Sequence, residues 1–317
     1  MKKIIALLLL FSLGLSACGT TGQEEADFAP AEENCLKVVT AMNKALWETF
    51  LMEFQEQSGI WVSIRELNPE ELTDAVRHGE ADLILGCGAD TALELEKFLA
   101  PLTVEGMENK LWTPVMYQLP VIIYNPYLIR KNPPEGWGDL ISLRWQGSFA
   151  VSDPNRDDMS RAVLPELLQL FPEREGRELM EAFSKNTGGV YGSADEVLDA
   201  VVEGSFPMGI VPESAALRAA AGGEKISIVY PREGALLCPE MAALPKKSEH
   251  PEQAGRLISF ILDEKTQRHG WEYLCLRPVL EEPEYLPEKP LFTDEENEDS
   301  EGQGPLEILN EIWKREA

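Results

Sequence analysis

The chain is poor in basic residues and in histidine. It has 28 Lys and Arg against 55 Asp and Glu, which gives a net charge of -27. So large an excess of acid repels nucleic-acid phosphates and anionic lipid surfaces, and we therefore expect no nucleic acid as a partner. The three histidines, His78, His250 and His269, are isolated from one another and form neither an HxxH nor an HExxH pattern. The sequence thus lacks a zinc-hydrolase motif, and we expect no resident metal and no cofactor.

Long apolar runs are also scarce, and the one clear example lies at the N-terminus. Lys2 and Lys3 precede apolar residues from Ile4 to Leu10, and the run continues less strictly to Ala17. A positive start, a short apolar middle and small residues at the end are typical of a secretory signal peptide. The run is too short for a stable transmembrane helix, so we predict a signal peptide over residues 1–17.

The residues around the predicted cleavage site, Leu15-Ser16-Ala17-Cys18, resemble the lipobox of bacterial lipoproteins. This resemblance implies that Cys18 is lipidated and becomes the new N-terminus, which anchors the protein to the bacterial cell membrane outside the cytoplasm, on its periplasmic or outer-surface face. A plain signal peptide followed by a chance cysteine is the alternative. Residues 18–34 include small, acidic and proline residues without periodicity, which indicates a flexible tether.

From residue 36 onward, apolar strands alternate with amphipathic helices. The patterns predict strands over 36–39, 61–64 and 81–85, with helices over 43–59 and 69–76 between them. Two β-α-β units in succession imply parallel strands with right-handed crossovers. The fold class is therefore α/β with doubly wound sheets.

Two later segments indicate that the chain passes between two sheets. The apolar stretch 116–125 contains Pro120, which a strand well inside a sheet would not tolerate but which suits a crossing strand. A strand near 236–243 could lead the chain back. Two crossings would produce two lobes with a cleft between them.

Three loops are candidate ligand sites, because each leaves the carboxyl end of a predicted strand and enters a helix. They are residues 40–43, residues 86–89 and the loop that begins at Asp153. A helix N-terminus favours an anion, and Arg156 is the local cation of the third loop, but Asp157 and Asp158 would repel an anion unless they act as caps. An ordinary capped surface helix explains this stretch equally well.

An ordered set of motifs between about Leu36 and Val279 resembles the solute-binding lipoproteins of ABC importers. More narrowly, it resembles type 2 periplasmic binding proteins of the ferric-iron and small-anion group, within the family 1 extracellular solute-binding proteins. The motifs are FQEQSGIWV, GEADLILG, PPEGWGDLISLRWQGSFAVSDP, VVEGSFPMGIV, IVYPREG and PEQAGRLISFILDEKTQ before RPV.

The resemblance implies a two-lobe fold in which each lobe is a doubly wound sheet and two hinge crossings join the lobes. Lobe 1 is then expected over residues 35–118 plus 235–280, and lobe 2 over 119–234. An acidic C-terminal extension over 281–317 follows, with 13 Asp and Glu against 3 Lys and Arg. Its last residues, 305–316, regain helical periodicity, so this segment could dock on the body.

The resemblance also implies which residues bind the ligand. They are Thr40, Ala41, Met42, Asn43, Gly86, Cys87 and Gly88 on the first lobe, and Asp153, Asn155, Arg156, Ser160, Gly192, Ser193, Glu213 and Ser214 on the second. Iron-binding members carry adjacent tyrosines where this chain has Pro212, Glu213 and Ser214, so we expect no free ferric iron. A carboxylate of Glu213 that faces the cleft favours a cation, whereas Arg156 favours an anion. The expected ligand is an anion, a zwitterion or a metal complex.

The implied function is capture of a small solute and its delivery to an ABC permease in the membrane, by a monomer that is not an enzyme. A ligand-sensing lipoprotein that partners a sensor kinase shares every one of these sequence features. A secreted lipoprotein hydrolase is the third hypothesis, although no GxSxG motif is present.

The cysteines leave several possibilities open. With Cys18 assigned to lipid, Cys35, Cys87, Cys238 and Cys275 remain, and an even count outside the cytoplasm permits two disulfides in three connectivities. The pairing of Cys238 with Cys275 is preferred because both lie in the returning segment. Unpaired thiols are the alternative, and no CxxC spacing supports a zinc site.

Overall fold

The structure, a computed structural model, describes residues 35–102, 110–171, 175–234, 237–279 and 305–316. The predicted signal peptide, Cys18 and the tether lie outside the described residues, as do residues 280–304 of the acidic extension. The chain from Cys35 onward forms one compact unit. The lobe boundaries at residues 118–119 and 234–235 therefore stay a prediction.

Strands and helices alternate along most of this unit. The strands are β1 (Cys35–Thr40), β2 (Trp61–Glu66), β3 (Leu83–Cys87), β4 (Leu99–Ala100), β5 (Trp112–Gln118), β6 (Pro120–Tyr124), β7 (Phe149–Ser152), β8 (Thr187–Tyr191), β9 (Met208–Pro212), β10 (Ser227–Val229) and β11 (Cys238–Pro245). The α-helices are α1 (Ala45–Ser58), α2 (Pro69–His78), α3 (Ala89–Glu94), α4 (Asp158–Leu170), α5 (Gly176–Asn186), α6 (Ala194–Val202), α7 (Glu213–Ala221), α8 (Pro251–Ile261), α9 (Glu264–Leu274) and α10 (Pro305–Glu316). Short 3-10 helices span Glu96–Phe98, Trp137–Ile141 and Leu143–Trp145.

The first sheet has the strand order β2-β1-β3-β11-β4, and β5 also pairs with β11. Strand β1 is parallel to β2, with Val38 opposite Ile64, and also parallel to β3, with Val38 opposite Leu83. These pairings confirm the two predicted β-α-β units. Strand β11 runs antiparallel to both β3 and β5.

The second sheet has the strand order β10-β6-β9-β7-β8. Strand β7 is parallel to β8 and to β9, whereas β6 is antiparallel to β9 and to β10. The sequence reading missed β8 and the preceding helix α5. Strand β8 contains two glycines, Gly188 and Gly189, and glycine weakens the apolar pattern by which a strand is recognised.

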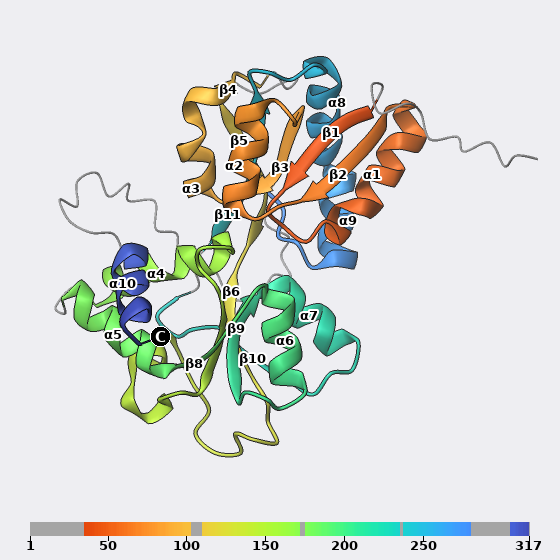
Figure 1. Ribbon diagram of the computed structural model, residues 1–317. Coiled ribbons are helices and arrows are strands. Elements are labelled where there is room, and N and C mark those ends of the chain that lie inside the picture. The colour runs from red at the N-terminus through yellow and green to blue at the C-terminus, as the bar shows by residue number, and fades with distance from the viewer. Residues whose placement is uncertain (1–34, 103–109, 172–174, 235–236, 280–304, 317) are drawn as a thin grey trace, which may run out of the picture. The chain divides into compact units, whose positions relative to one another are not determined.

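Helices cover both faces of each sheet (Figure 1), because successive side chains of a strand point to opposite faces. In the first sheet, Val38 packs with α1 and α8, whereas its neighbour Val39 packs with α2 and α3. In the second sheet, Val151 packs with α4 and α5, whereas Ala150 packs with α6. These paired cores confirm the predicted two-sheet α/β fold class.

The chain passes between the sheets where the sequence indicates. Strand β5 ends at Gln118 in the first sheet, and β6 begins at Pro120 in the second. Proline is tolerated there because the first residue of a strand need not donate a ladder hydrogen bond. The chain returns between β10 and β11, a segment that contains residues 235–236 outside the described part.

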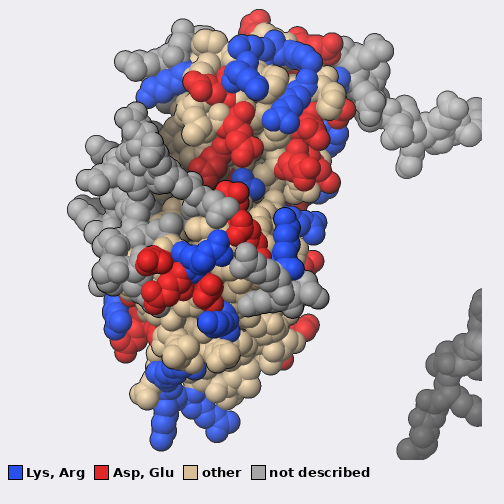
Figure 2. All heavy atoms as spheres, turned by 60° about the vertical axis from the view of Figure 1, so that its left-hand side comes forward, with Lys and Arg blue, Asp and Glu red and all other residues tan. Residues whose placement is uncertain are grey.

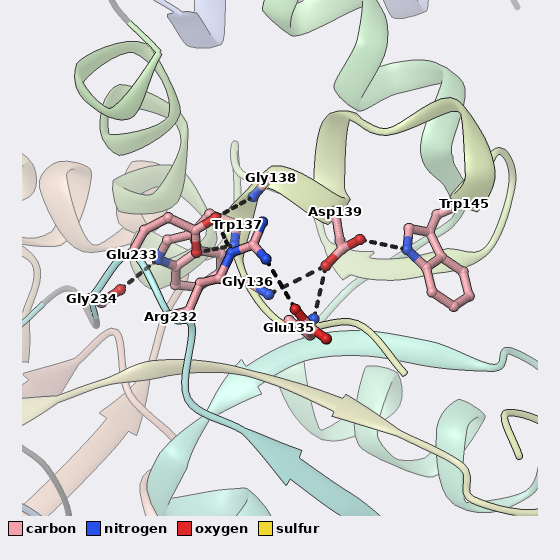
Figure 3. A network of polar contacts seen from close by, with 9 residues as sticks. All are labelled: Glu135, Gly136, Trp137, Gly138, Asp139, Trp145, Arg232, Glu233 and Gly234. Atoms are coloured by element: carbon pink, nitrogen blue, oxygen red, sulfur yellow. Dashed lines mark hydrogen bonds and ion pairs between the residues drawn. The ribbon is translucent and has the colours of Figure 1, made fainter. Parts of the chain in front are cut away.

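A polar network joins residues 232–234, at the start of the returning segment, to residues 135–138 (Figure 3). The Glu233 carboxylate accepts hydrogen bonds from the backbone N–H groups of Trp137, at 3.0 Å, and Gly138, at 3.1 Å. The Trp137 indole donates to the Gly234 carbonyl at 2.9 Å, and Arg232 pairs with Glu135 at 3.0 Å. The motifs PPEGWGDL and IVYPREG, 95 residues apart, therefore act as one structural unit.

Local signals explain where the helices begin and end. Asn68 and Glu71 form a reciprocal capping box at the start of α2, and Pro69 occupies its first turn. Helix α1 ends at Gly59, whose φ of 70° lies in the left-handed region that favours glycine.

No helix in the described part of the chain combines the length and the apolarity that a membrane span requires.

The preferred disulfide is not formed in this structure. Cys275 carries a free thiol, so its expected pairing with Cys238 is wrong here. Cys87 is also a free thiol and is buried at the end of β3. A core of this size, with helices on both faces of each sheet, does not depend on a covalent staple.

Candidate functional site

A cavity of about 300 Å³ lies at the carboxyl ends of the parallel strands of both sheets. Parallel strands place all their exit loops at one edge, which is why five separate strand ends contribute to it. Its lining from the first sheet's side comprises Ala41, Met42, Asn43, Leu46, Glu66, Leu67, Asn68, Glu71, Gln118 and Glu240. From the second sheet's side it comprises Arg156, Asp157, Asp158, Met159, Gly192, Ser193, Ala194, Asp195, Pro212, Ser214, Ala215 and Arg218.

Acidic side chains dominate the charged part of this lining. Two cations, Arg156 and Arg218, face six acids, Glu66, Glu71, Asp157, Asp158, Asp195 and Glu240. Arg218 is already engaged, because its Nη1 donates to the Leu274 carbonyl at 2.7 Å, and burial lowers its pKa. The cavity therefore attracts positive charge overall.

Glu240 is the most deeply buried of these acids, with only 6 % of its surface exposed. Burial, together with the nearby carboxylates of Asp158 and Asp157, raises its pKa to about 8, even though a hydrogen bond from Gln118 lowers it. That hydrogen bond runs from Gln118 Nε2 to Glu240 Oε1 at 2.7 Å. At neutral pH the Glu240 carboxyl is thus mostly protonated.

Asp157 and Asp158 lie at the start of α4, and Asp157 caps this helix. Asp157 is the N-cap, and its Oδ1 accepts the Ser160 N–H at 2.7 Å. Burial raises the pKa of both carboxyls, although hydrogen bonds from Ser160 and from Gly88 oppose that effect. The Asp158 carboxylate raises the pKa of both Asp157 and Glu240, and the Asp157 carboxylate also raises the pKa of Glu240, so these three carboxyls form one group.

Two hydrogen-bonded contacts join the loops of the two sheets around the cavity. Asp158 Oδ2 accepts the Gly88 N–H at 2.8 Å, and the Thr91 hydroxyl donates to Asp158 Oδ1 at 3.0 Å. On another side, Asn43 Nδ2 donates to Asp195 Oδ2 at 2.6 Å. Two acids in loops of the second sheet, Asp158 and Asp195, thus bind loops of the first sheet on different sides of the cavity.

Seven of the residues predicted to bind ligand line the cavity: Ala41, Met42, Asn43, Arg156, Gly192, Ser193 and Ser214. Ser214 is 4 % exposed, and its Oγ has no hydrogen-bond partner among the described residues. A buried hydroxyl that lines a cavity is suited to bond a bound molecule. Ser193 also caps α6, where its Oγ accepts the Glu196 N–H at 3.3 Å.

The other predicted residues do not line the cavity but support the loops that do. Thr40 Oγ1 donates to the Gly86 carbonyl at 3.2 Å and accepts the Trp47 indole N–H at 3.1 Å. A Cβ atom on Gly86 would lie 2.7 Å from the Met42 sulfur, so glycine is required there by close packing. A Cβ on Gly88 would similarly lie 2.8 Å from Cβ of Asp158, and Cys87 is buried beneath this loop.

The remaining members of this supporting set belong to the loop between β7 and α4. Asp153 Oδ1 accepts the Asn155 N–H at 2.9 Å, which closes the turn. Asn155 is exposed and bonds Asn310 of helix α10. The Ser160 hydroxyl is buried against Ser152 Oγ at 2.5 Å, so it faces the core of the second sheet.

Glu213 does not face the cavity, which corrects the expectation for its carboxylate. Only 1 % of the residue is exposed, and its two oxygens are held by Arg277, at 2.6 Å from Nε and 2.9 Å from Nη2. The Tyr230 hydroxyl donates to the same carboxylate at 2.7 Å, and burial raises the pKa of that phenol. A buried carboxylate needs such a partner, so Glu213 is a structural anchor between the two sheets.

Sequence reasoning missed most of the acids that face the cavity. Glu66 and Glu71 flank the start of α2, and Asp195 lies in the first turn of α6, so helix-start patterns placed them without revealing what they face. Gln118 and Glu240 lie on the antiparallel strands β5 and β11. The signal that could have found them is their position as polar residues inside apolar strands.

Comparison with known proteins identifies the family. A family model described as "Bacterial extracellular solute-binding protein" matches residues 97–294. The chain belongs to this family. Its members, unlike the enzymes considered above, are binding proteins, and they act outside the cytoplasm. The binding protein described here is therefore extracytoplasmic by family.

This solute-binding protein is similar to one curated relative and to two solved structures described here. It is 24% identical over 192 residues to the spermidine/putrescine-binding periplasmic protein of Escherichia coli (strain K12), a match that covers 56% of this chain and 54% of that protein. The chain thus spans about half the length of that relative. Iron-bound HitA from Pseudomonas aeruginosa is 22% identical, with a TM-score of 0.66 over 81% of this chain and 90% of that one. The fructose-6-phosphate-bound periplasmic binding protein AfuA from Actinobacillus pleuropneumoniae is 15% identical, with a TM-score of 0.69 over 77% and 84%.

These structural likenesses establish the two-lobe fold of periplasmic binding proteins and leave the ligand to the chemistry of this cavity. Of the described residues that line it, none is Tyr or His. Nor does any group of three or more His, Cys, Asp and Glu in the described part of the chain have an arrangement that could hold a metal ion. The described lining is built from carboxylates, amides and hydroxyls, with two arginines.

Proposed function

We propose that this protein captures a small solute that carries amino groups, of the diamine or polyamine class, and delivers it to an ABC importer. The observation that carries the proposal is the set of three mutually close carboxyls, Asp157, Asp158 and Glu240, in a lining where acids outnumber cations. An ammonium group donates up to three hydrogen bonds and offsets the charge of nearby carboxylates. The spermidine/putrescine-binding relative supports the same ligand class.

The anionic ligands expected from the ferric-iron and small-anion group fit this cavity less well. A phosphate ester would lie close to five acids besides the mostly protonated Glu240. Of the two described lining cations, Arg218 is engaged with the Leu274 carbonyl, which leaves Arg156. Like charges in a poorly hydrated cavity repel strongly. A zwitterion is accommodated if its anionic end reaches Arg156, which is exposed at the edge of the cavity.

Delivery and anchoring complete the proposal. The family supports an extracytoplasmic location, and the lipobox at Cys18 supports a lipid tether to the membrane. That the protein acts as a monomer is part of the same proposal. Ligand held between the two sheets stabilises the closed arrangement, which a permease recognises. Binding is the whole function in this proposal, and no catalytic step is assigned.

The test is a titration of the lipid-free mature protein with spermidine, putrescine, fructose 6-phosphate and ferric citrate, followed by calorimetry and by thermal unfolding. A ligand at 100 times its Kd should raise the free energy of unfolding by about 2.7 kcal/mol. We expect this from a polyamine and not from the phosphate ester. Binding of fructose 6-phosphate or ferric citrate without binding of either amine would refute the proposed ligand class.

A matched pair of variants assigns the effect to the cavity. Asp157→Asn removes one negative charge from the lining and should weaken amine binding about tenfold. Asp199→Asn removes one negative charge from α6 at an exposed position outside the lining, and it should leave the affinity unchanged. Equal losses in both variants would indicate that only the overall charge of the protein matters.

A further inference from the structure

The C-terminal helix α10 lies against the elements that carry one wall of the cavity. It contacts α4 and α5 beside the second sheet (Figure 1). Three of its apolar residues, Ile308, Leu309 and Ile312, are buried in the core that contains the α4 residues Val163, Leu164 and Leu167. This confirms that residues 305–316 form a helix that docks on the body.

A second contact joins α10 directly to the ligand loop. Asn155 and Asn310 exchange two hydrogen bonds: Asn155 Nδ2 donates to Asn310 Oδ1 at 2.9 Å, and Asn310 Nδ2 donates to Asn155 Oδ1 at 2.8 Å. A reciprocal amide pair fixes the orientation of both side chains as well as their distance. Asn155 directly precedes Arg156, Asp157 and Asp158 in the cavity lining.

The loop itself is held by a chain of short-range bonds that begins at Asn155. Asp153 Oδ1 accepts both the backbone N–H and the side-chain amide of Asn155, each at 2.9 Å. The Asp153 carbonyl accepts the N–H groups of Arg156, at 2.8 Å, and Asp157, at 2.9 Å. The position of Asn155 is therefore coupled to the positions of the next two residues.

We propose that α10 is a positioning element of the solute site, in which Asn310 holds the loop 153–158 through Asn155 and so sets the placement of Arg156 and Asp157. The functional part of this inference rests on the proposed solute-binding role, whereas the structural part does not. Helix α10 lies beyond residue 294, where the match to the family model ends. Helix α10 thus acts on the affinity of a site whose second-sheet lining, from Arg156 to Arg218, lies within the matched residues.

The acidic face of α10 supplies a matched control. Glu311 adjoins Asn310 in sequence, but its carboxylate pairs with Arg177 of α5 at 2.8 Å, away from the ligand loop. Both members of that ion pair are more than a third exposed. If α10 serves only to cover the core, then Asn310→Ala and Glu311→Ala should have similar effects.

The experiment measures backbone amide hydrogen exchange of residues 153–160 and the affinity for spermidine in the full mature chain. Asn155→Ala and Asn310→Ala are expected to speed exchange in this segment and to weaken spermidine binding about fivefold, the effect of losing a net hydrogen bond. The double variant should lose no more than either single variant, because one pair is broken in all three. Glu311→Ala should leave both exchange and affinity as in the wild type.

Several results would overturn the inference. They are unchanged exchange at residues 153–160 in Asn310→Ala, additive losses in the double variant, or equal losses in Asn310→Ala and Glu311→Ala. If the wild-type protein does not bind spermidine, the proposed ligand class falls. The exchange measurement then decides the positioning role alone, because it needs no ligand.

Discussion

Because the Glu240 carboxyl is mostly protonated at pH 7, we predict that solute affinity depends on pH. With a pKa of about 8, the Glu240 carboxyl is about one-tenth ionised at pH 7. A bound ammonium group favours the ionised form, so binding at pH 7 must expel a proton from this site. Affinity for the fully protonated amine should therefore rise as the pH increases from 7 to 9, once the measured affinity is corrected for the fraction of amine that is fully protonated at each pH.

The magnitude follows from the fraction of ionised carboxylate. If binding requires ionised Glu240, the apparent affinity scales with that fraction, which rises from about 0.1 at pH 7 to about 0.9 at pH 9. The expected gain in affinity for fully protonated spermidine is therefore about tenfold over this range. At pH 7, close to one proton should be released for each solute bound.

Calorimetry in buffers of different ionisation enthalpy measures both quantities, since the slope of the observed enthalpy against buffer enthalpy counts the protons released. Glu240→Gln should bind spermidine more weakly at every pH, and both its affinity and its enthalpy should lose the dependence on pH and buffer. Glu66→Gln serves as the matched control, because Glu66 is exposed and lines the same cavity. A wild-type affinity that is flat between pH 7 and 9, with no proton release, would refute the reasoning.

The same pKa fixes the sign of the effect of Glu240 on stability. Its pKa in the folded protein lies above the ordinary value of 4.5, so the unfolded chain loses this proton first as the pH rises. The contribution of this proton to the free energy of unfolding is complete below pH 4.5 and is lost as the pH rises to 8. Glu240→Gln should remove that decline and stabilise the fold at pH 7 by up to the order of 3 kcal/mol, measured by urea unfolding. The variant thus becomes more stable while it binds less well.

Three further predictions concern a buried ion pair, a glycine beside the cavity and the predicted lipidation site. Arg277→Met leaves the Glu213 carboxylate buried without its cation, so urea unfolding should show a loss of about 3–5 kcal/mol, and a double variant with Glu213→Leu should recover most of it. Gly88→Ala pushes against Asp158, at 2.8 Å, so it should weaken solute binding with little change in melting temperature; unaltered binding would contradict the role of this contact. Cys18→Ala should move the protein from the membrane fraction to the soluble fraction, and a protein that stays with the membrane would exclude the predicted lipid anchor.

The sequence was sufficient for the fold class and for most of the loops around the cavity because both depend on local patterns. Apolar alternation at residues 36–39 and 61–64 predicts strands, and the helices between them end at glycines. Parallel pairing then brings the strand exits to one edge. Asn43 and Arg156 were predicted to line the cavity for this reason, whereas Ser193 was indicated only by the family resemblance, because its strand β8 was missed.

The long-range partners of individual side chains were not accessible in the same way. Glu213 directly follows a strand, as a ligand residue would, but Arg277 lies 64 residues further along the chain and takes up both carboxylate oxygens. Asn155 likewise turns to Asn310, which is 155 residues away. A residue's place in a loop follows from local sequence, whereas the direction of its side chain depends on which distant group the fold brings near it.

The charge of the whole chain illustrates the same limit and shows why the cavity decides the ligand. On the face shown in Figure 2, exposed acidic patches lie beside Lys and Arg. Exposed charges separated by more than roughly 8 Å are largely screened at physiological salt, so a net charge of -27 places no constraint on the solute. Glu240 and its neighbours Asp157 and Asp158 differ because burial reduces that screening. A few buried carboxyls therefore outweigh the many exposed ones in selecting a cationic solute, and neutralising them one at a time should change affinity where neutralising exposed acids does not.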